Sequence, residues 1–513
     1  MMKSAYFLTL AAAFLSTSTV SPVTAKTWHV PGDAPTIKGG INLASAGDTV
    51  LVACGTYYEY SIAMKSGVCL RSETGEATCV TIDAQQQARV MRCRGVSSTT
   101  RIEGFTIRGG LTADEGGGLY CLDFSSPTVA NCIFEGDSAF FGGGVRCYNN
   151  SSPRFINCTF TGNSADTGGG ISCQGNSSPT LTDCSLSDNS ASSSGGGMNC
   201  YHACSLTLTN CTFSNNRAVY RGAGIGISRE CTATLTDCTF SDNSSSTGAG
   251  MFASFDGSAV LTNCTFTNNS GSQGTGMFLG GNASATLSNC SFTGNSASSR
   301  GSGIRLDEAA TVTLTSCSFT GNSSGMNGAI YLASTSHLTA DDTEFRNNSG
   351  GEGVGMSLRD NATAILANCT FVNNSGSQGG GMFLSDNTAA TLTHCSFARN
   401  WATLAGGGMV LSDASATLIN CSLTDNFAYQ GGGIALWYAA HMTADTTAFE
   451  GNQCRGFNMG AHGFVGGASE AVLTCCVPDL SGFAGDGTII LNNEGCITPV
   501  EPISWGRLKA LYQ

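Results

Sequence analysis

The chain has 513 residues and a formal net charge of −13, with 68 glycines, 25 cysteines and only 23 lysines and arginines. No lysine lies between Lys65 and Lys509, which argues against nucleic acid and anionic membrane surfaces as partners, because polyanions bind to clustered positive charge. No long helical pattern follows residue 50, so the composition excludes a mainly helical protein.

The first 25 residues are typical of a secretory signal. Lys3 precedes an apolar segment at residues 5–15, and the stretch ends in Val23-Thr24-Ala25, at the positions where a signal peptidase selects small residues. No other segment reaches the roughly 18 consecutive apolar residues of a membrane-spanning helix. We therefore expect a mature chain without a transmembrane segment that is secreted or displayed at the cell surface, with association to an outer membrane as a further option.

Residues 26–104 are expected to form an N-terminal cap and the first coils of a repeat structure. Ile37, Ile41 and Ala44 lie on one face of a short amphipathic helix, and the sequence GDTVLV at residues 47–52 follows as a first strand. Such a helix would cover the unpaired strands at this end, which otherwise invite aggregation.

Residues 105–455 contain thirteen copies of a unit that ends in the motif Phe/Leu-x-x-Asn/Asp. Every step between copies is 26 or 27 residues, and each copy has three short Thr-, Ile-, Leu- and Phe-rich patches separated by Gly, Asn, Ser and Asp. This pattern predicts an all-β, single-stranded, right-handed parallel β-helix of about 13 regular coils, with further coils before and after them. The motifs begin at Phe134, Phe160, Leu186, Phe213, Phe240, Phe266, Phe292, Phe319, Phe345, Phe371, Phe397, Leu423 and Phe449.

Three columns of residues define the coil. A cysteine stands two residues before the Phe in eleven copies, and a second column begins with cysteine and continues with Ile, Ala and Leu, which indicates inward-facing core sites. Asn fills the fourth place of Phe-x-x-Asn in twelve copies, where it suits a left-handed turn and where stacked amides can hydrogen-bond between coils. The second column begins with Cys121, Cys147, Cys173 and Cys200.

The regular period stops near residue 455. Residues 456–498 are expected to form the last coils and a C-terminal cap, and Pro499 and Pro502 mark residues 499–513 as a linker and short tail. Trp505, Leu508 and Tyr512 would share one face of a short helix in that tail. The tail is either part of the cap, which we favour, or a sorting tag.

Two resemblances follow from these motifs. The segment from Trp28 to Asp83 and the coil pattern resemble the right-handed parallel β-helix, pectate-lyase-like superfamily. The Gly-rich tetrapeptides, such as GGGI and the variant NGAI at residues 327–330, followed by Phe-x-x-Asn, resemble repeats of the polymorphic outer-membrane protein family, which implies a surface-exposed adhesin. The membrane barrel of that family is not expected here, because too few residues follow Asn452 for eight strands of about ten residues.

The cysteines divide into a ladder and a set of exceptions. In-register neighbours on stacked strands lie near the ~4.8 Å coil spacing, farther apart than the ~3.8 Å that a disulfide requires between Cβ atoms, so the ladder is expected to hold buried free thiols. No Cys-x-x-Cys pair with zinc spacing occurs, which disfavours a thiolate metal array. The disulfide candidates lie off the ladder, at Cys204, Cys231, Cys475 and Cys496, and cysteines in the two caps are further candidates.

Two sets of side chains are candidate ligand sites. Asp360, Asp386 and Asp413 recur at one position of successive copies and would stack on one turn, where calcium could bridge them; other copies carry turn formers there, so a plain turn is the alternative. Trp401, Phe427 and Tyr429 gather near the C-terminal coils and suit the face of a sugar ring, although packing of the last coils explains them equally well.

The repeat argues against catalysis. No copy exceeds its neighbours by more than one residue, so long loops that would wall an active-site groove are missing. We therefore expect an exported, non-catalytic, adhesin-like scaffold without a cofactor apart from calcium, whose partner is an extracellular glycan or a cell-surface protein. The alternative is a carbohydrate-active polysaccharide lyase or glycoside hydrolase of the pectate-lyase-like superfamily.

Overall fold

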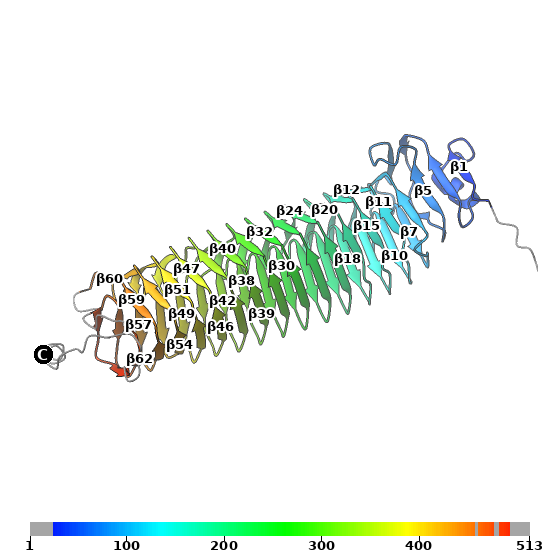
Figure 1. Ribbon diagram of the computed structural model, residues 1–513. Coiled ribbons are helices and arrows are strands. Elements are labelled where there is room, and N and C mark those ends of the chain that lie inside the picture. Colours follow the sequence, from blue (N-terminus) through cyan, green and yellow to red (C-terminus); the bar gives the residue numbers. More distant parts are fainter. Residues whose placement is uncertain (1–23, 457–459, 477–481, 493–513) are drawn as a thin grey trace, which may run out of the picture.

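The computed structural model describes residues 24–456, 460–476 and 482–492, and in them the chain winds into a long parallel β-helix (Figure 1). One coil consists of β26 (Ile225–Ser228), β27 (Thr232–Thr236), β28 (Thr239–Ser241) and β29 (Ser244–Thr247). Each strand pairs in parallel with its equivalents on the coils before and after it. The predicted all-β solenoid is confirmed.

Three long sheets run along the rod. Sheet A has 19 strands, from β1 (Thr27–Val30) to β64 (Thr488–Asn492). Sheet B has 16 strands, from β3 (Gly55–Tyr57) to β59 (Ala448–Glu450). Sheet C begins at β4 (Ile62–Ala63) and ends at β63 (Phe483–Ala484).

A fourth, narrower sheet was not predicted. The Ser-rich segment after each Asn forms a short strand in most coils, giving sheet D, whose two parts run from β13 (Ser138–Phe141) to β41 (Ser323–Ser324) and from β48 (Ser375–Gln378) to β60 (Gln453–Cys454). Bridges at Ser349 connect the two parts. Serine has little preference for strands, but coils of equal length place each backbone opposite its equivalent, so the hydrogen bonds form regardless of the side chain.

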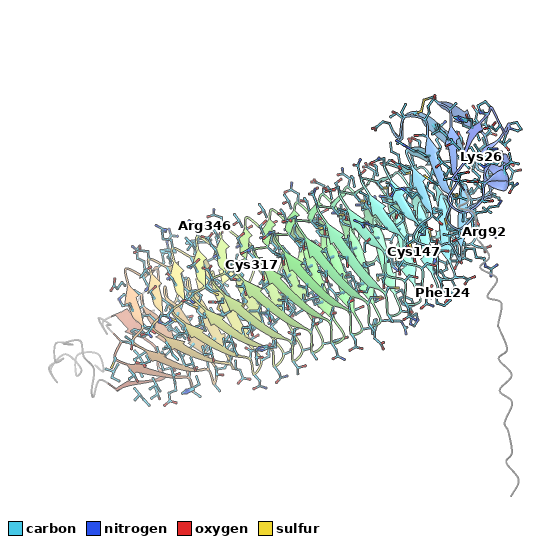
Figure 2. The ribbon with its side chains drawn as sticks, turned by 45° about the vertical axis from the view of Figure 1, so that its right-hand side comes forward. Lys26, Arg92, Phe124, Cys147, Cys317 and Arg346 are labelled. Atoms are coloured by element: carbon cyan, nitrogen blue, oxygen red, sulfur yellow. A yellow bond between two sulfur atoms is a disulfide. The ribbon has the colours of Figure 1, made fainter. Side chains whose placement is uncertain are left out.

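The core consists of buried side chains stacked in columns, with one member of each column from every coil. From Phe213 to Phe397 the successive rings lie parallel, with centroids 4.5 to 5.1 Å apart. The cysteines of the long ladder are buried free thiols, as predicted, and their Sγ atoms contact backbone carbonyls; Cys264, for example, lies 3.4 Å from the carbonyl oxygen of Thr262. Figure 2 shows Cys147 and Cys317 within the rod. The ladder residues are Cys132, Cys158, Cys184, Cys211, Cys238, Cys264, Cys290, Cys317, Cys369, Cys395 and Cys421.

The asparagines form a continuous ladder of hydrogen bonds between coils. Asn269 Nδ2 donates to the carbonyl of Phe240 at 3.0 Å and to Asn295 Oδ1 at 3.0 Å, and its Oδ1 accepts from the backbone and side chain of Asn243. The predicted amide stacking is therefore present. The left-handed backbone conformation, however, is at Asn268, with φ 54°, one residue before the ladder residue Asn269. This turn lets the Asn269 side chain point inward and join the ladder.

The N-terminal end is closed by the predicted helix. In α1 (Ile37–Leu43), Ile37 and Ile41 are buried, and the Thr36 side chain accepts a hydrogen bond from the Gly39 amide. The Glu59 carboxylate accepts from the Ile37 and Lys38 amides, which have no partner within the helix. A disulfide between Cys54 and Cys79 connects neighbouring coils of this cap.

Several predictions fall partly or wholly outside the described residues. The signal segment at residues 1–25 lies outside them except for its last two residues, and the linker and tail at residues 499–513 lie outside them entirely. Within the described parts of the chain, no helix has the length and apolar character needed to cross a bilayer.

Candidate functional site

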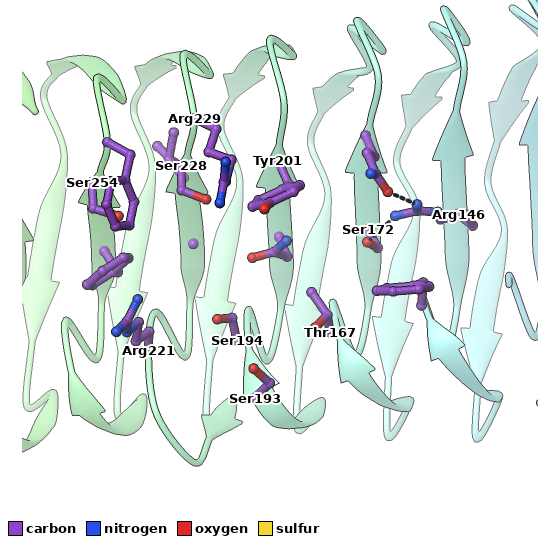
Figure 3. A pocket seen from close by; sticks show the side chains of 17 residues that line it. Arg146, Thr167, Ser172, Ser193, Ser194, Tyr201, Arg221, Ser228, Arg229 and Ser254 are labelled. Carbon is purple, nitrogen blue, oxygen red and sulfur yellow. Dashed lines mark hydrogen bonds between the residues drawn. The ribbon is translucent and has the colours of Figure 1, made fainter. Parts of the chain in front are cut away.

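A hollow opens on the side of the rod between sheets C and D (Figure 3). Each strand of sheet C has two inward-facing core residues, such as Val145 and Cys147, and the residue between them faces outward. In consecutive coils this outward column reads Arg146, Ser172, Asn199, Gly226 and Phe252. The three small side chains in the middle leave a space of about 430 Å³ between the arginine and the phenylalanine. The walls of this hollow are therefore large side chains beside small ones. Long loops, which the sequence analysis treated as necessary for a groove, are not needed.

Arg146, on β14 (Val145–Tyr148), is only 2% exposed. Its Nη1 donates to Ser172 Oγ at 2.7 Å and its Nη2 to Gln174 Oε1, and an Nη2 to Glu115 distance of 3.7 Å places that carboxylate nearby. The guanidinium lies 4.9 Å from the centre of the Phe141 ring. Its Nε is buried without a hydrogen-bond partner, which is unfavourable unless a ligand or water satisfies it.

Two further arginines line the hollow. The Arg221 guanidinium lies 5.2 Å from the centre of the Phe252 ring, and that of Arg229 lies 5.1 Å from the Tyr201 ring. Stacking of this kind holds a guanidinium in place while leaving its N–H groups free to bind. Ser254 Oγ, also at the hollow, is buried without a partner.

The charge of the hollow differs from that of the chain. The 17 described residues that line it include three arginines and no Asp, Glu, His or Lys, although the whole chain carries −13. Arginine presents a planar set of donors that matches carboxylate and sulfate groups and does not lose its proton in proteins. The hollow can therefore bind an anion, but its lining holds neither of the two carboxylates that glycoside hydrolysis requires.

The three aspartates predicted as a calcium site lie on one turn of successive coils. Asp360, Asp386 and Asp413 all have left-handed backbones, with φ of 56°, 61° and 51°. Asp386 Oδ2 accepts from Ser385 Oγ at 2.7 Å and lies 3.7 Å from Arg359 Nη1. Among the described residues, the three carboxylates do not form a set whose ligand atoms all lie within 4.8 Å of one another. The turn geometry is present, and calcium binding stays a prediction.

The aromatic candidates lie close together on sheet D and beside it. Trp401, in β52 (Trp401–Ala405), pairs in register with Phe427 on the next coil, as the repeat spacing predicted. Trp401 and Tyr429 are exposed, and the Arg455 guanidinium lies 5.5 Å from the centre of the Phe427 ring. These rings are available to a ligand, and sugar binding by them stays a prediction.

The disulfide candidates have different surroundings. Cys204 and Cys231 are free thiols on adjacent coils, with the Cys204 amide 3.4 Å from Cys231 Sγ, and their disulfide stays a prediction. Cys475 is disulfide-bonded, whereas Cys496 lies outside the described residues. Cys93, grouped with the cap cysteines by sequence, instead pairs in register with Cys121 and extends the second core column by one coil.

The hollow itself escaped the sequence analysis. Arg146 lies one residue before Cys147, between two inward positions, so the register of the core columns already places it on the outer face. Arg221 lies on the sheet D side of the hollow, and Arg229 lies in the turn after β26. Both line the same hollow as Arg146 only because of the relative orientation of sheets C and D, which the sequence does not show. For Arg221 a departure from the repeat was the available signal, because the equivalent residues on the adjacent coils are Ser194 and Thr247.

The parallel β-helix defines the class of this protein. The family described as "Right handed beta helix region" matches residues 90–258, 223–379 and 328–470, and the chain belongs to it. The winding expected from the sequence agrees with that description.

Solved structures give more distant likenesses. The N-terminal fragment of bacteriophage Phi29 gene product 12 is 13% identical, with a TM-score of 0.28, over 89% of this chain and 92% of that one. A mannuronic acid specific polysaccharide family 6 lyase enzyme from human gut microbiota is 10% identical, with a TM-score of 0.30, over 94% of this chain and 93% of that one. A comparison with curated proteins gives no match.

Proposed function

We propose that the protein is an exported, non-catalytic, adhesin-like scaffold that binds an acidic glycan, and that the hollow around Arg146, Arg221 and Arg229 is its binding site. The observation that carries this proposal is the concentration of three arginines in a lining without any carboxylate, on a chain that is acidic elsewhere. The predicted secretory signal supports a location outside the cell, at the surface or in the medium.

The shape of the depression suits a chain-like ligand. A second space of about 200 Å³ adjoins the hollow and shares Arg221, Phe252 and Ser254 with it. Asp307 and Glu308 line its far side, where they would repel a further acidic group. A short acidic segment of a polymer would therefore lie along the rod, with its charged groups at the arginines and its ring faces against Tyr201 and the phenylalanines.

Binding of defined oligosaccharides tests this proposal. Oligomers of a uronic acid are expected to bind the full chain and neutral oligomers of the same length are not, with affinity that falls as salt is added. Arg221→Gln and Arg229→Gln should each weaken binding at least about tenfold, which corresponds to the loss of one charge-assisted hydrogen bond. Calorimetric titration gives both comparisons.

The control is Arg346→Gln. Arg346 lies on sheet B, in an ion pair with Glu344 (Figure 2), so its loss changes the net charge equally without touching the hollow. Equal weakening by Arg346→Gln would reduce the interaction to long-range charge and contradict a site at the hollow. Equal binding of acidic and neutral oligomers would contradict the proposed ligand class.

The alternative is a carbohydrate-active lyase or hydrolase with a shallow site near the C-terminal coils. The exposed pair Trp401 and Tyr429, and the turns after the sheet C strands that carry Asp386 and Asp413 in the same region of the rod, support it. Incubation with neutral and acidic polysaccharides, followed for new reducing ends and unsaturated products, separates the two functions. We expect no turnover; turnover that Asp386→Ala abolishes would establish the enzyme instead.

A further inference from the structure

Three cysteine thiols converge inside the rod beneath the coils that carry the hollow. Cys200 is on β22 (Met198–Tyr201), Cys204 precedes β23 (Ser205–Thr209), and Cys231 occupies the same place on the next coil. The three Sγ atoms all lie within 4.8 Å of one another, and the residues are 0%, 1% and 0% exposed. Within the described residues, this is the one group of three or more Cys, His, Asp or Glu side chains with that proximity.

The convergence arises where two columns of the coil meet. Cys200 belongs to the inward column of sheet C, whereas Cys204 and Cys231 stand at the corner between sheets C and A. In neighbouring coils that corner holds small side chains, and there the Ser125 and Ser151 amides donate to Ser151 Oγ and Ser177 Oγ, at 3.2 Å in both cases. The Cys204 amide makes the equivalent contact with Cys231 Sγ. The corner thus places two sulfurs on consecutive coils and Cys200 supplies the third.

This triangle differs from the long cysteine ladder. Ladder thiols form a single line and contact backbone carbonyls of their own and the preceding coil. At the corner, three sulfurs from two different columns converge within 4.8 Å of one another, although Cys204 Sγ also contacts the carbonyl oxygens of Tyr201 and His202.

We propose that Cys200, Cys204 and Cys231 bind one Cu(I) ion. Soft sulfur ligands select Cu(I) and zinc among the common metals, and structural zinc almost always takes four protein ligands, whereas three sulfurs meet here. Bonds from the ion to sulfur replace S–H bonds, the protons leave to solvent, and no oxidation state changes. This proposal is independent of glycan binding, and it replaces the Cys204–Cys231 disulfide that the sequence spacing suggested.

The fold offers substitutions that remove the ligands without disturbing the coil. Ser occupies the corner in other coils, so Cys204→Ser and Cys231→Ser fit there; Ala253 stands in the Cys200 column, so Cys200→Ala fits as well. Cys290→Thr is the matched control, because Thr343 and Thr447 fill the ladder position in two coils and Cys290 is equally buried.

The experiment uses the reduced full chain under anaerobic conditions, titrated with Cu(I) in competition with a chromogenic chelator. The expected result is one tightly bound equivalent whose X-ray absorption shows only sulfur neighbours. Each cluster variant should lose affinity at least about tenfold, and Cys290→Thr should not. Parallel titration with zinc should give weaker binding that the same variants leave unchanged.

Two results would overturn the proposal. One is Cu(I) binding that survives Cys231→Ser and Cys204→Ser at full affinity. The other is a protein that, as isolated from an oxidising compartment, yields on digestion a disulfide-linked peptide joining Cys204 to Cys231, because the disulfide would then be the native state of the corner. Circular dichroism of each variant distinguishes loss of the site from loss of the fold.

Discussion

At the scale of single residues, the structure depends on side chains that repeat one interaction in every coil. The asparagine ladder satisfies backbone groups that the sharp turns leave unpaired, and each amide contacts both neighbouring coils. Its first position is the exception. Asp137 stands there, fully buried, with Oδ1 accepting from the Gly110 amide at 2.7 Å and Oδ2 without a partner.

Asp137→Asn is expected to stabilise the protein. Burial raises the pKa of Asp137 in the folded chain well above its ordinary value of 3.8. At a pH between the unfolded and the folded pKa, the folded chain therefore keeps a proton that the unfolded chain has released. The free energy of unfolding therefore falls as pH rises through that window. In Asp137→Asn, an NH₂ group replaces Oδ2, supplies a hydrogen-bond donor and does not titrate. The free energy of unfolding should therefore rise by about 1–3 kcal/mol at pH 7, and this difference from the unsubstituted chain should shrink towards pH 3.

Urea unfolding between pH 3 and pH 8, followed by circular dichroism, measures this effect. Asp188→Asn is the control, because Asp188 is an exposed turn residue with φ 56° and the substitution has the same size. A gain at Asp137 that does not depend on pH would contradict the proposed origin.

At the scale of elements, the sequence predicted the columns better than the strands. The recurring Phe, Cys, Leu and Asn marked the inward positions of sheets B and C and of the turns on either side of sheet B, because burial leaves a periodic mark in the sequence. Sheet D left none, since its strands range from Ser244–Thr247 to Trp401–Ala405 without a shared pattern, and they pair because the coil lengths match. The hollow was missed for a related reason: it is defined by small residues at Ser172, Asn199 and Gly226, which carry no chemical signature.

The N-terminal cap provides a test at this scale. Cys54 follows β2 (Thr49–Val52) and Cys79 precedes β6 (Val80–Asp83), at a sequence separation of 25. Replacing both by Ser removes a constraint on the unfolded cap worth about 3 kcal/mol. Amide hydrogen exchange should quicken in β2 and β6 and stay unchanged in β27, because each coil contacts only its neighbours.

Cys69→Ser is the comparison for the cap, since Cys69 is a free, partly exposed thiol in the same region. Exchange that quickens equally along the whole rod would show that the cap and the repeats unfold as one unit, contrary to this expectation.

At the scale of the whole molecule, coils are interchangeable where register is preserved. Removing residues 265–290 joins Cys264 to Ser291 and replaces one coil boundary by an equivalent one. We expect the shortened chain to keep its β spectrum, its unfolding midpoint and glycan binding, since the residues lining the hollow all remain. Circular dichroism and calorimetry measure these properties.

The matched control removes only residues 265–277. This change shifts all later core residues out of their columns, so the downstream coils should lose their cooperative unfolding transition. If both deletions behaved alike, coil register would not be what maintains the fold.

The nearly constant length of successive coils also has a consequence for how the gene can evolve. A gene that encodes such coils can gain or lose a whole one by unequal recombination, and both the reading frame and the cross-section of the product stay intact. Length can then vary between descendants while the hollow, built from only a few coils in the N-terminal half of the rod, is inherited unchanged.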